Sequence, residues 1–110
     1  MKAKAPSPPK CKITTQYRSR NGFVYEIESA AGVALALHIS REPPWGNTGD
    51  WYMVAHQGRN ADAVVSESAA TGTEALSRIE QSWVAKASEL GLPVFDWPAV
   101  ASALLSVRAI

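Results

Sequence analysis

The sequence predicts an α+β fold: a four- or five-stranded antiparallel sheet, arranged as a meander, followed by one long and one short C-terminal helix packed on one face. Apolar and polar residues alternate from about position 12 to position 67, which is the two-residue period of β-strands. From position 71 onward, apolar residues recur every three or four positions, as is typical of α-helices. Because the strands precede the helices instead of alternating with them, we expect one face of the sheet to be covered.

Length and composition predict one domain. A chain of 110 residues, 46% of them hydrophobic, is long enough to enclose a core of its own. We expect residues 1–11 to form a disordered basic arm, because this stretch is rich in proline and has no large apolar residue after Met1, and residues 12–110 to form a single α+β domain. The lone cysteine, Cys11, excludes an internal disulfide framework.

The start of the chain predicts a cytoplasmic location. Its basic residues are followed by proline and serine where a secretory signal would be apolar. No apolar run approaches the roughly 18 residues that a membrane-spanning helix needs, so we expect no membrane partner.

The first two strands are expected to form a hairpin. Positions 13–17 and 23–28 both alternate, and Asn21-Gly22 between them is a strong signal for a two-residue hairpin turn. A turn centred on these two residues would place Tyr17 opposite Glu26.

Two or three more strands follow. Positions 33–39 continue the alternation, and a loop rich in glycine and proline at 43–50 leads into a strand at 51–57 and a weaker one at 63–68. Trp45 is the candidate anchor in this loop, because an indole there either docks a partner or covers an edge of the domain's own core.

Capping residues mark both helices. Thr71 and Glu74 have the spacing of a capping box before a helix at 73–90, and Gly91 is suited to end it. A shorter helix is expected after Asp96. The apolar faces of the two helices comprise Leu76, Ile79, Trp83, Ala87 and Leu90 in the first and Val100, Leu104 and Val107 in the second.

The strand pattern also places a group of polar side chains on the sheet face turned away from the helices. If the odd positions of the strands at 33–39 and 51–57 share the core face, His38 lies either directly opposite His56 or on its diagonal. The candidate binding residues on this face are Tyr17, Glu26, His38, Tyr52 and His56.

This face supports three interpretations besides that of an ordinary exposed surface. Aromatic side chains on a sheet suit the stacking of single-stranded nucleic acid. A partly apolar face suits contact with a second copy of the chain. The alternative, from another class, is a small metal-dependent enzyme or metal-binding protein in which His38 and His56, with Glu26, hold a divalent ion.

Charge is distributed unevenly along the chain. Residues 1–20 carry six basic side chains and no acidic one, whereas residues 21–110 carry five basic and ten acidic side chains. Such a basic arm on an acidic body can attract phosphates. The basic residues of the arm are Lys2, Lys4, Lys10, Lys12, Arg18 and Arg20.

Motifs that would indicate an enzyme or a cofactor are absent from the sequence. It has no GxSxG, HExxH, GxxxxGK[ST] or GxGxxG, so we predict no cofactor, no metal and no catalytic residue. The expected function is that of a non-enzymatic interaction module, self-associating and able to contact nucleic acid through the arm and the outward sheet face.

Overall fold

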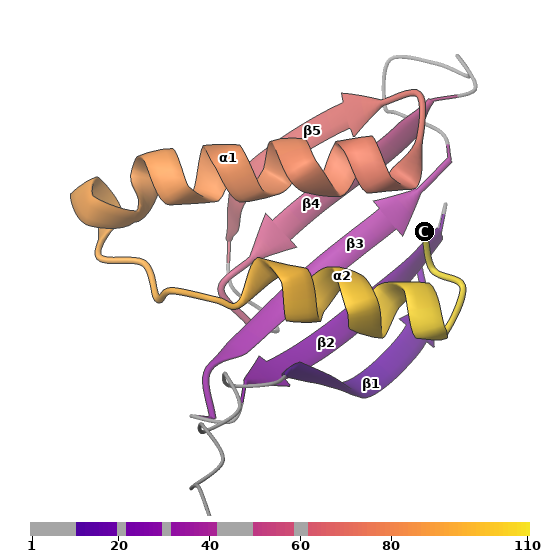
Figure 1. The fold of residues 1–110 in the computed structure, drawn as a ribbon, viewed down its shortest axis with the longest axis horizontal. Helices are drawn as coiled ribbons and strands as arrows, with labels where there is room; N and C mark the ends of the chain where they lie inside the picture. Colours follow the sequence, from indigo (N-terminus) through magenta and orange to yellow (C-terminus); the bar gives the residue numbers. More distant parts are fainter. Residues whose placement is uncertain (1–10, 20–21, 30–31, 42–49, 59–61) are drawn as a thin grey trace, which may run out of the picture.

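The computed structural model describes residues 11–19, 22–29, 32–41, 50–58 and 62–110. Five strands precede two helices, and each strand pairs antiparallel with the next along the chain, in the order β1-β2-β3-β4-β5 (Figure 1). This arrangement confirms the predicted fold class and the fifth strand. The elements are β1 (Cys11–Arg18), β2 (Gly22–Ser29), β3 (Ala34–Ser40), β4 (Trp51–His56), β5 (Ala63–Ala69), α1 (Gly72–Leu90) and α2 (Trp97–Ser106).

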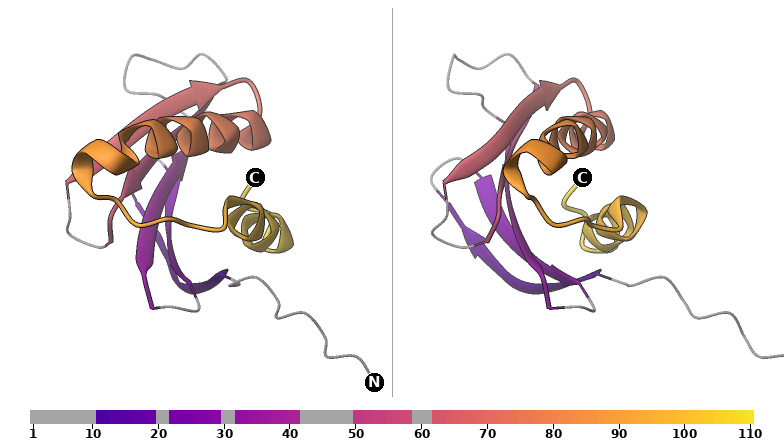
Figure 2. Two further views of the ribbon diagram at one scale, coloured as in Figure 1. Left: turned by 60° about the vertical axis from the view of Figure 1, so that its left-hand side comes forward. Right: turned by 90° about the vertical axis from the view of Figure 1, so that its left-hand side faces the viewer.

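Both helices lie on the same side of the sheet. Figure 1 shows α1 running over β4 and β5 and α2 over the half of the sheet formed by β1 to β3. In Figure 2, none of the described helices or strands lies on the opposite face of the sheet. The core between these layers contains nearly every large apolar side chain that the alternation predicted. Its fully enclosed members are Trp83, Ile27, Leu35, Leu37, Met53, Ile79, Leu104 and Val100.

The helix ends follow the predicted caps. The Thr71 hydroxyl accepts a hydrogen bond from the Glu74 backbone N–H at 3.1 Å, and Gly91 ends α1 in the left-handed conformation with φ 65°. The Asp96 carboxylate accepts the Ala99 backbone N–H at 3.2 Å at the start of α2. These contacts satisfy backbone groups that a helix end otherwise leaves unpaired.

Two residues assigned to the apolar helix faces are exposed instead. Leu90 is in the last turn of α1, which extends past the strands in Figure 1, and its side chain is 56% exposed. Val107 follows the end of α2 as its C-cap and is 44% exposed. Their helical spacing is therefore not accompanied by burial, and Val107 instead lines an open groove together with Cys11 and Ile13 of β1.

The pairing of the first hairpin differs from the prediction. The Ser19 N–H donates to the Gly22 carbonyl at 2.8 Å, so the first hairpin pairs Ser19 with Gly22, which a turn centred on Asn21-Gly22 does not allow. Tyr17 therefore lies opposite Val24 and not opposite Glu26. Gly22 is instead the first residue of β2, where a Cβ would lie 2.0 Å from the Ile39 carbonyl oxygen. Glycine is therefore required at position 22 because β2 and β3 approach closely there, and not because of the turn.

An irregularity in β1 changes which side chains face the core. The register of β1 against β2 shifts between Ile13 and Thr15, as a β-bulge produces. Ile13 lies opposite Ile27 and packs against the core, whereas Thr15 and Tyr17 lie on the other face. Strict alternation would have placed all three on one face.

Candidate functional site

The face of the sheet opposite the helices, here called the outer face, brings the predicted binding residues together. One row of mutually opposite residues crosses all five strands, and a second row runs beside it. The first row contains Tyr17, Val24, His38, Val54 and Ser66. The second contains Thr15, Glu26, Ala36 and His56. Tyr52 lies on the same face between Ser40 and Ser68. All five predicted residues therefore share this surface.

The two histidines are diagonal neighbours on adjacent strands. His38 lies opposite Val54 and His56 lies opposite Ala36, which is the second of the two registers that the sequence allowed. Both imidazoles are half-buried, as are Glu26 and Tyr52, whereas Tyr17 is 39% exposed. The side chains of the outer face are thus partly shielded by their neighbours but still accessible to solvent.

Ser19 is a contact of His38 that sequence reasoning missed. Its hydroxyl lies 2.6 Å from Nε2 of His38 in a partly buried position. Burial lowers the pKa of His38, and the nearby His56 lowers it further. A neutral His38 can accept the Ser19 proton. The spacing of residues in the sequence could not reveal the contact between Ser19 and His38, because this contact depends on the position of the first hairpin turn.

The metal cluster of the alternative interpretation is not assembled. Among the residues that the structure describes, no three His, Cys, Asp or Glu side chains form a group able to hold a metal ion. His38 and His56 share a face with Glu26, but a shared face is not a ligand set, which requires side chains converging on one point.

The predicted basic residues fall into three groups. Lys12 is exposed on β1 opposite Glu28, on the outer face. Arg18 lies on the other face, with its guanidinium carbon 5.5 Å from the centre of the Phe23 ring. The remaining predicted residues lie outside the described part of the chain, and so does the loop anchor: Lys2, Lys4, Lys10, Arg20 and Trp45.

An apolar groove between β1 and α2 is a second feature that the sequence did not predict. It has a volume of about 1210 Å³, and its walls include Cys11, Ile13, Val94 and Ala103. Burial raises the pKa of the Cys11 thiol, as does the Asp96 carboxylate, whereas the Asp96 backbone hydrogen bond lowers it. A thiol with a raised pKa is a poor nucleophile at neutral pH.

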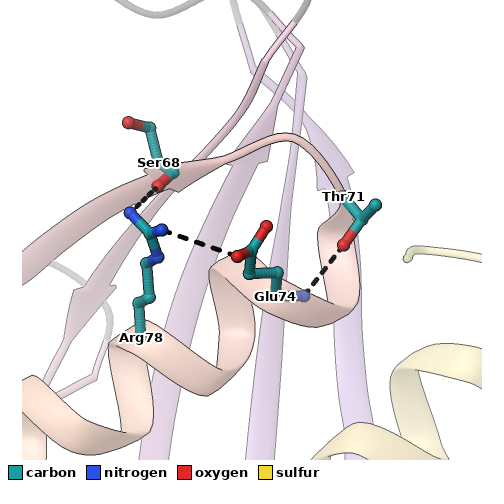
Figure 3. Close-up of polar contacts among 4 residues, drawn as sticks. All are labelled: Ser68, Thr71, Glu74 and Arg78. Carbon is teal, nitrogen blue, oxygen red and sulfur yellow. Dashed lines mark hydrogen bonds and ion pairs between the residues drawn. The ribbon is translucent and has the colours of Figure 1, made fainter.

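The β5 edge of the sheet is covered by cationic side chains of α1. Arg78 donates to the Ser68 carbonyl at 3.2 Å while its guanidinium lies 3.5 Å from the Glu74 carboxylate (Figure 3). Lys86 donates to the Val64 carbonyl at 3.3 Å. These bonds occupy carbonyls that another strand would otherwise use for pairing.

Comparison with known proteins identifies no relative: no protein-family model matches the chain, and searches of curated proteins and of solved structures find no match. Within the described residues, no helix has the length and hydropathy to cross a membrane.

Proposed function

We propose that this chain is a non-enzymatic interaction module that self-associates through its outer face. The observation that carries the proposal is the one-sided arrangement of the helices, both of which pack on the other face of the sheet. Along the first row of the outer face lie two half-buried valines, Val24 and Val54, and one aromatic side chain, the exposed Tyr17. Covering such side chains removes apolar surface from water, which favours association.

Charge on the outer face is compatible with a second copy. Lys12 lies opposite Glu28 across β1 and β2. The first row of the outer face contains no lysine, arginine, aspartate or glutamate. Two identical faces can then meet along this row without placing like charges together, as a two-fold interface requires.

The dimensions of the face predict a weak dimer. Five strands at their usual spacing and a seven-residue central strand span about 20 Å by 23 Å, or about 450 Å² per copy. Two copies would bury about 900 Å², below the roughly 1,200 Å² of a standard stable interface. Two copies should therefore associate reversibly, and the dimer should be observable only at high protein concentration.

Sedimentation velocity over a concentration series tests this proposal. Val54→Glu places a charge at the centre of the outer face, and we expect it to abolish the concentration-dependent increase in sedimentation coefficient. Val84→Glu is the matched control, because Val84 is 60% exposed on α1, away from the outer face. Equal association of the two variants, each with native circular dichroism, would disprove a dimer through the outer face.

Contact with nucleic acid is the second candidate function, favoured by the six basic residues within positions 1–20 and by the exposed Tyr17 on the outer face. A single-stranded oligonucleotide should then bind with an affinity that falls steeply with salt. Deleting residues 1–10 removes Lys2, Lys4 and Lys10 and none of β1, so the log–log salt slope should flatten by roughly 2. Absence of binding at low salt would end this hypothesis.

An enzyme that uses His38 has one supporting contact, the hydrogen bond between Ser19 and His38, which has the geometry of a nucleophile and its base. The Ser19 backbone N–H already donates to the Gly22 carbonyl, so it does not serve as an oxyanion donor. Labelling of Ser19 by a fluorophosphonate, lost in His38→Ala, would favour this function over a purely interacting module. An unlabelled Ser19 would exclude it.

A further inference from the structure

The outer face contains a pair of titratable side chains at its centre. His38 and His56 are diagonal neighbours on β3 and β4, and the apolar residues Val24, Val54 and Ala36 lie directly opposite them on adjacent strands. Histidine is the side chain whose charge normally changes between pH 5 and pH 8. A partner that covers the centre of the outer face therefore buries both imidazoles, either neutral or protonated.

We propose that His38 and His56 make association through the outer face pH-dependent, so that copies join while the imidazoles are neutral and separate when the imidazoles are protonated. This inference rests on the proposed function and names the regulation of the same surface.

The neutral form is already favoured in the single chain. His38 is partly buried, and its Nε2 can accept the Ser19 hydroxyl proton in the neutral tautomer that is protonated at Nδ1. Burial lowers the pKa of His38, and the His56 charge lowers it further. A second copy on the outer face would bury the ring more deeply and bring two more imidazoles close. Both changes oppose protonation.

The other ionisable groups of the face do not cancel two added charges. β1 contributes Tyr17 to this face, β4 contributes Tyr52, and β5 contributes Ser66 and Ser68. From β2, Glu26 lies in the row of His56 and on the diagonal of His38, so one carboxylate faces two imidazoles. Lys12 and Glu28 offset each other one row farther along.

The direction of the pH effect follows from proton linkage. If the dimer holds fewer protons than two separate copies, lowering the pH favours separation. Each proton that must be released weakens association by about tenfold per pH unit, once the pH is below the pKa of that group in the free chain. Each dimer contains four imidazoles, and release of protons from two or more of them gives an expected rise of the dissociation constant of about tenfold between pH 7.5 and pH 5.5.

Sedimentation velocity at pH 7.5 and pH 5.5, at matched ionic strength, measures this change. The His38→Gln/His56→Gln variant has no imidazole to protonate, and we expect it to associate equally at both pH values. His56→Lys carries a permanent charge and should dissociate already at pH 7.5, so it tests the same idea without acid. Circular dichroism at each pH confirms that every variant is folded.

The outcomes separate this inference from the proposed function. If the unmodified chain shows no association at pH 7.5, or association that Val54→Glu does not weaken, the dimer through the outer face is wrong and the inference fails with it. If association is sensitive to Val54→Glu but equal at both pH values, or survives His56→Lys, the dimer stands and the role of the histidines is overturned.

Discussion

Trp83 shows how much of the fold depends on single side chains. It is fully enclosed, lies edge-on to Phe95 and Trp97 with ring centroids 5.7 and 6.0 Å away, and donates its indole N–H to the Pro93 carbonyl at 2.9 Å. These contacts join α1 to the segment that leads into α2.

Trp83→Ala should therefore lower the free energy of unfolding by about 3–5 kcal/mol, because it leaves a large cavity and an unpaired carbonyl. Urea denaturation followed by circular dichroism measures the change. The neighbouring Val84 is 60% exposed, and Val84→Ala should alter stability by no more than about 0.5 kcal/mol. Equal effects of the two substitutions would contradict the central position of Trp83.

Gly22 is a residue whose type was predicted to matter for a reason that differs from the one in the structure. Asn-Gly is a strong turn signal because a tight hairpin turn needs positive φ, and the sequence therefore predicts a turn at Asn21-Gly22. The structure places Gly22 inside β2, where β3 approaches too closely for any side chain. Both roles require glycine, and the sequence alone does not distinguish them. The resulting change of register moved Tyr17 from Glu26 to Val24.

At the level of elements, the α1 cap is a direct test of how the long helix begins. The Thr71 hydroxyl accepts the Glu74 backbone N–H in an exposed position, as Figure 3 shows. Thr71→Ala should lower the free energy of unfolding by about 1 kcal/mol, since that N–H loses its intramolecular partner. Thr71→Ser is the control, because it retains the hydroxyl and should change stability by less. An unchanged urea midpoint in Thr71→Ala would show that the helix does not depend on this cap.

The helices and strands differed in how much the sequence revealed. Capping residues and periodicity are local, so both ends of α1 and the start of α2 were predicted closely. The exposure of Leu90 and Val107 depends on how each helix is placed against the rest of the domain, which helical spacing alone does not determine. The irregularity between Ile13 and Thr15 in β1 likewise came from pairing with β2 and was not visible in the alternation.

At the scale of the molecule, the order of strands before helices was sufficient to predict one covered and one open face. The shared face of His38, His56 and Tyr52 followed from the two-residue strand period and from the parity of their pairing. Contacts that cross between elements could not be predicted. The bond between Ser19 and His38 and the groove beside Cys11 depend on three-dimensional closeness.

The open sheet also has two edges, and both are protected against pairing with another chain. β1 has an irregular register and exposed cationic side chains, Lys12 and Arg18. Beside β5, Arg78 and Lys86 occupy the Ser68 and Val64 carbonyls. Charged residues and bulges at sheet edges oppose edge-to-edge association. The proposed self-association would then use the outer face, which closes a dimer, and not the edges, where pairing would add further copies without limit.

Opening the β5 edge should remove this limit. In Arg78→Ala/Lys86→Ala the two carbonyls lose their side-chain donors, so we expect assemblies larger than a dimer to grow with time, as measured by multi-angle light scattering. Lys2→Ala/Lys4→Ala is the matched control, because it changes the formal net charge from +1 to the same value of −1 without altering the described part of the chain. If both double variants remain as small as the unmodified chain, Arg78 and Lys86 do not protect this edge. If both grow alike, the loss of positive charge, and not the exposed strand, drives assembly.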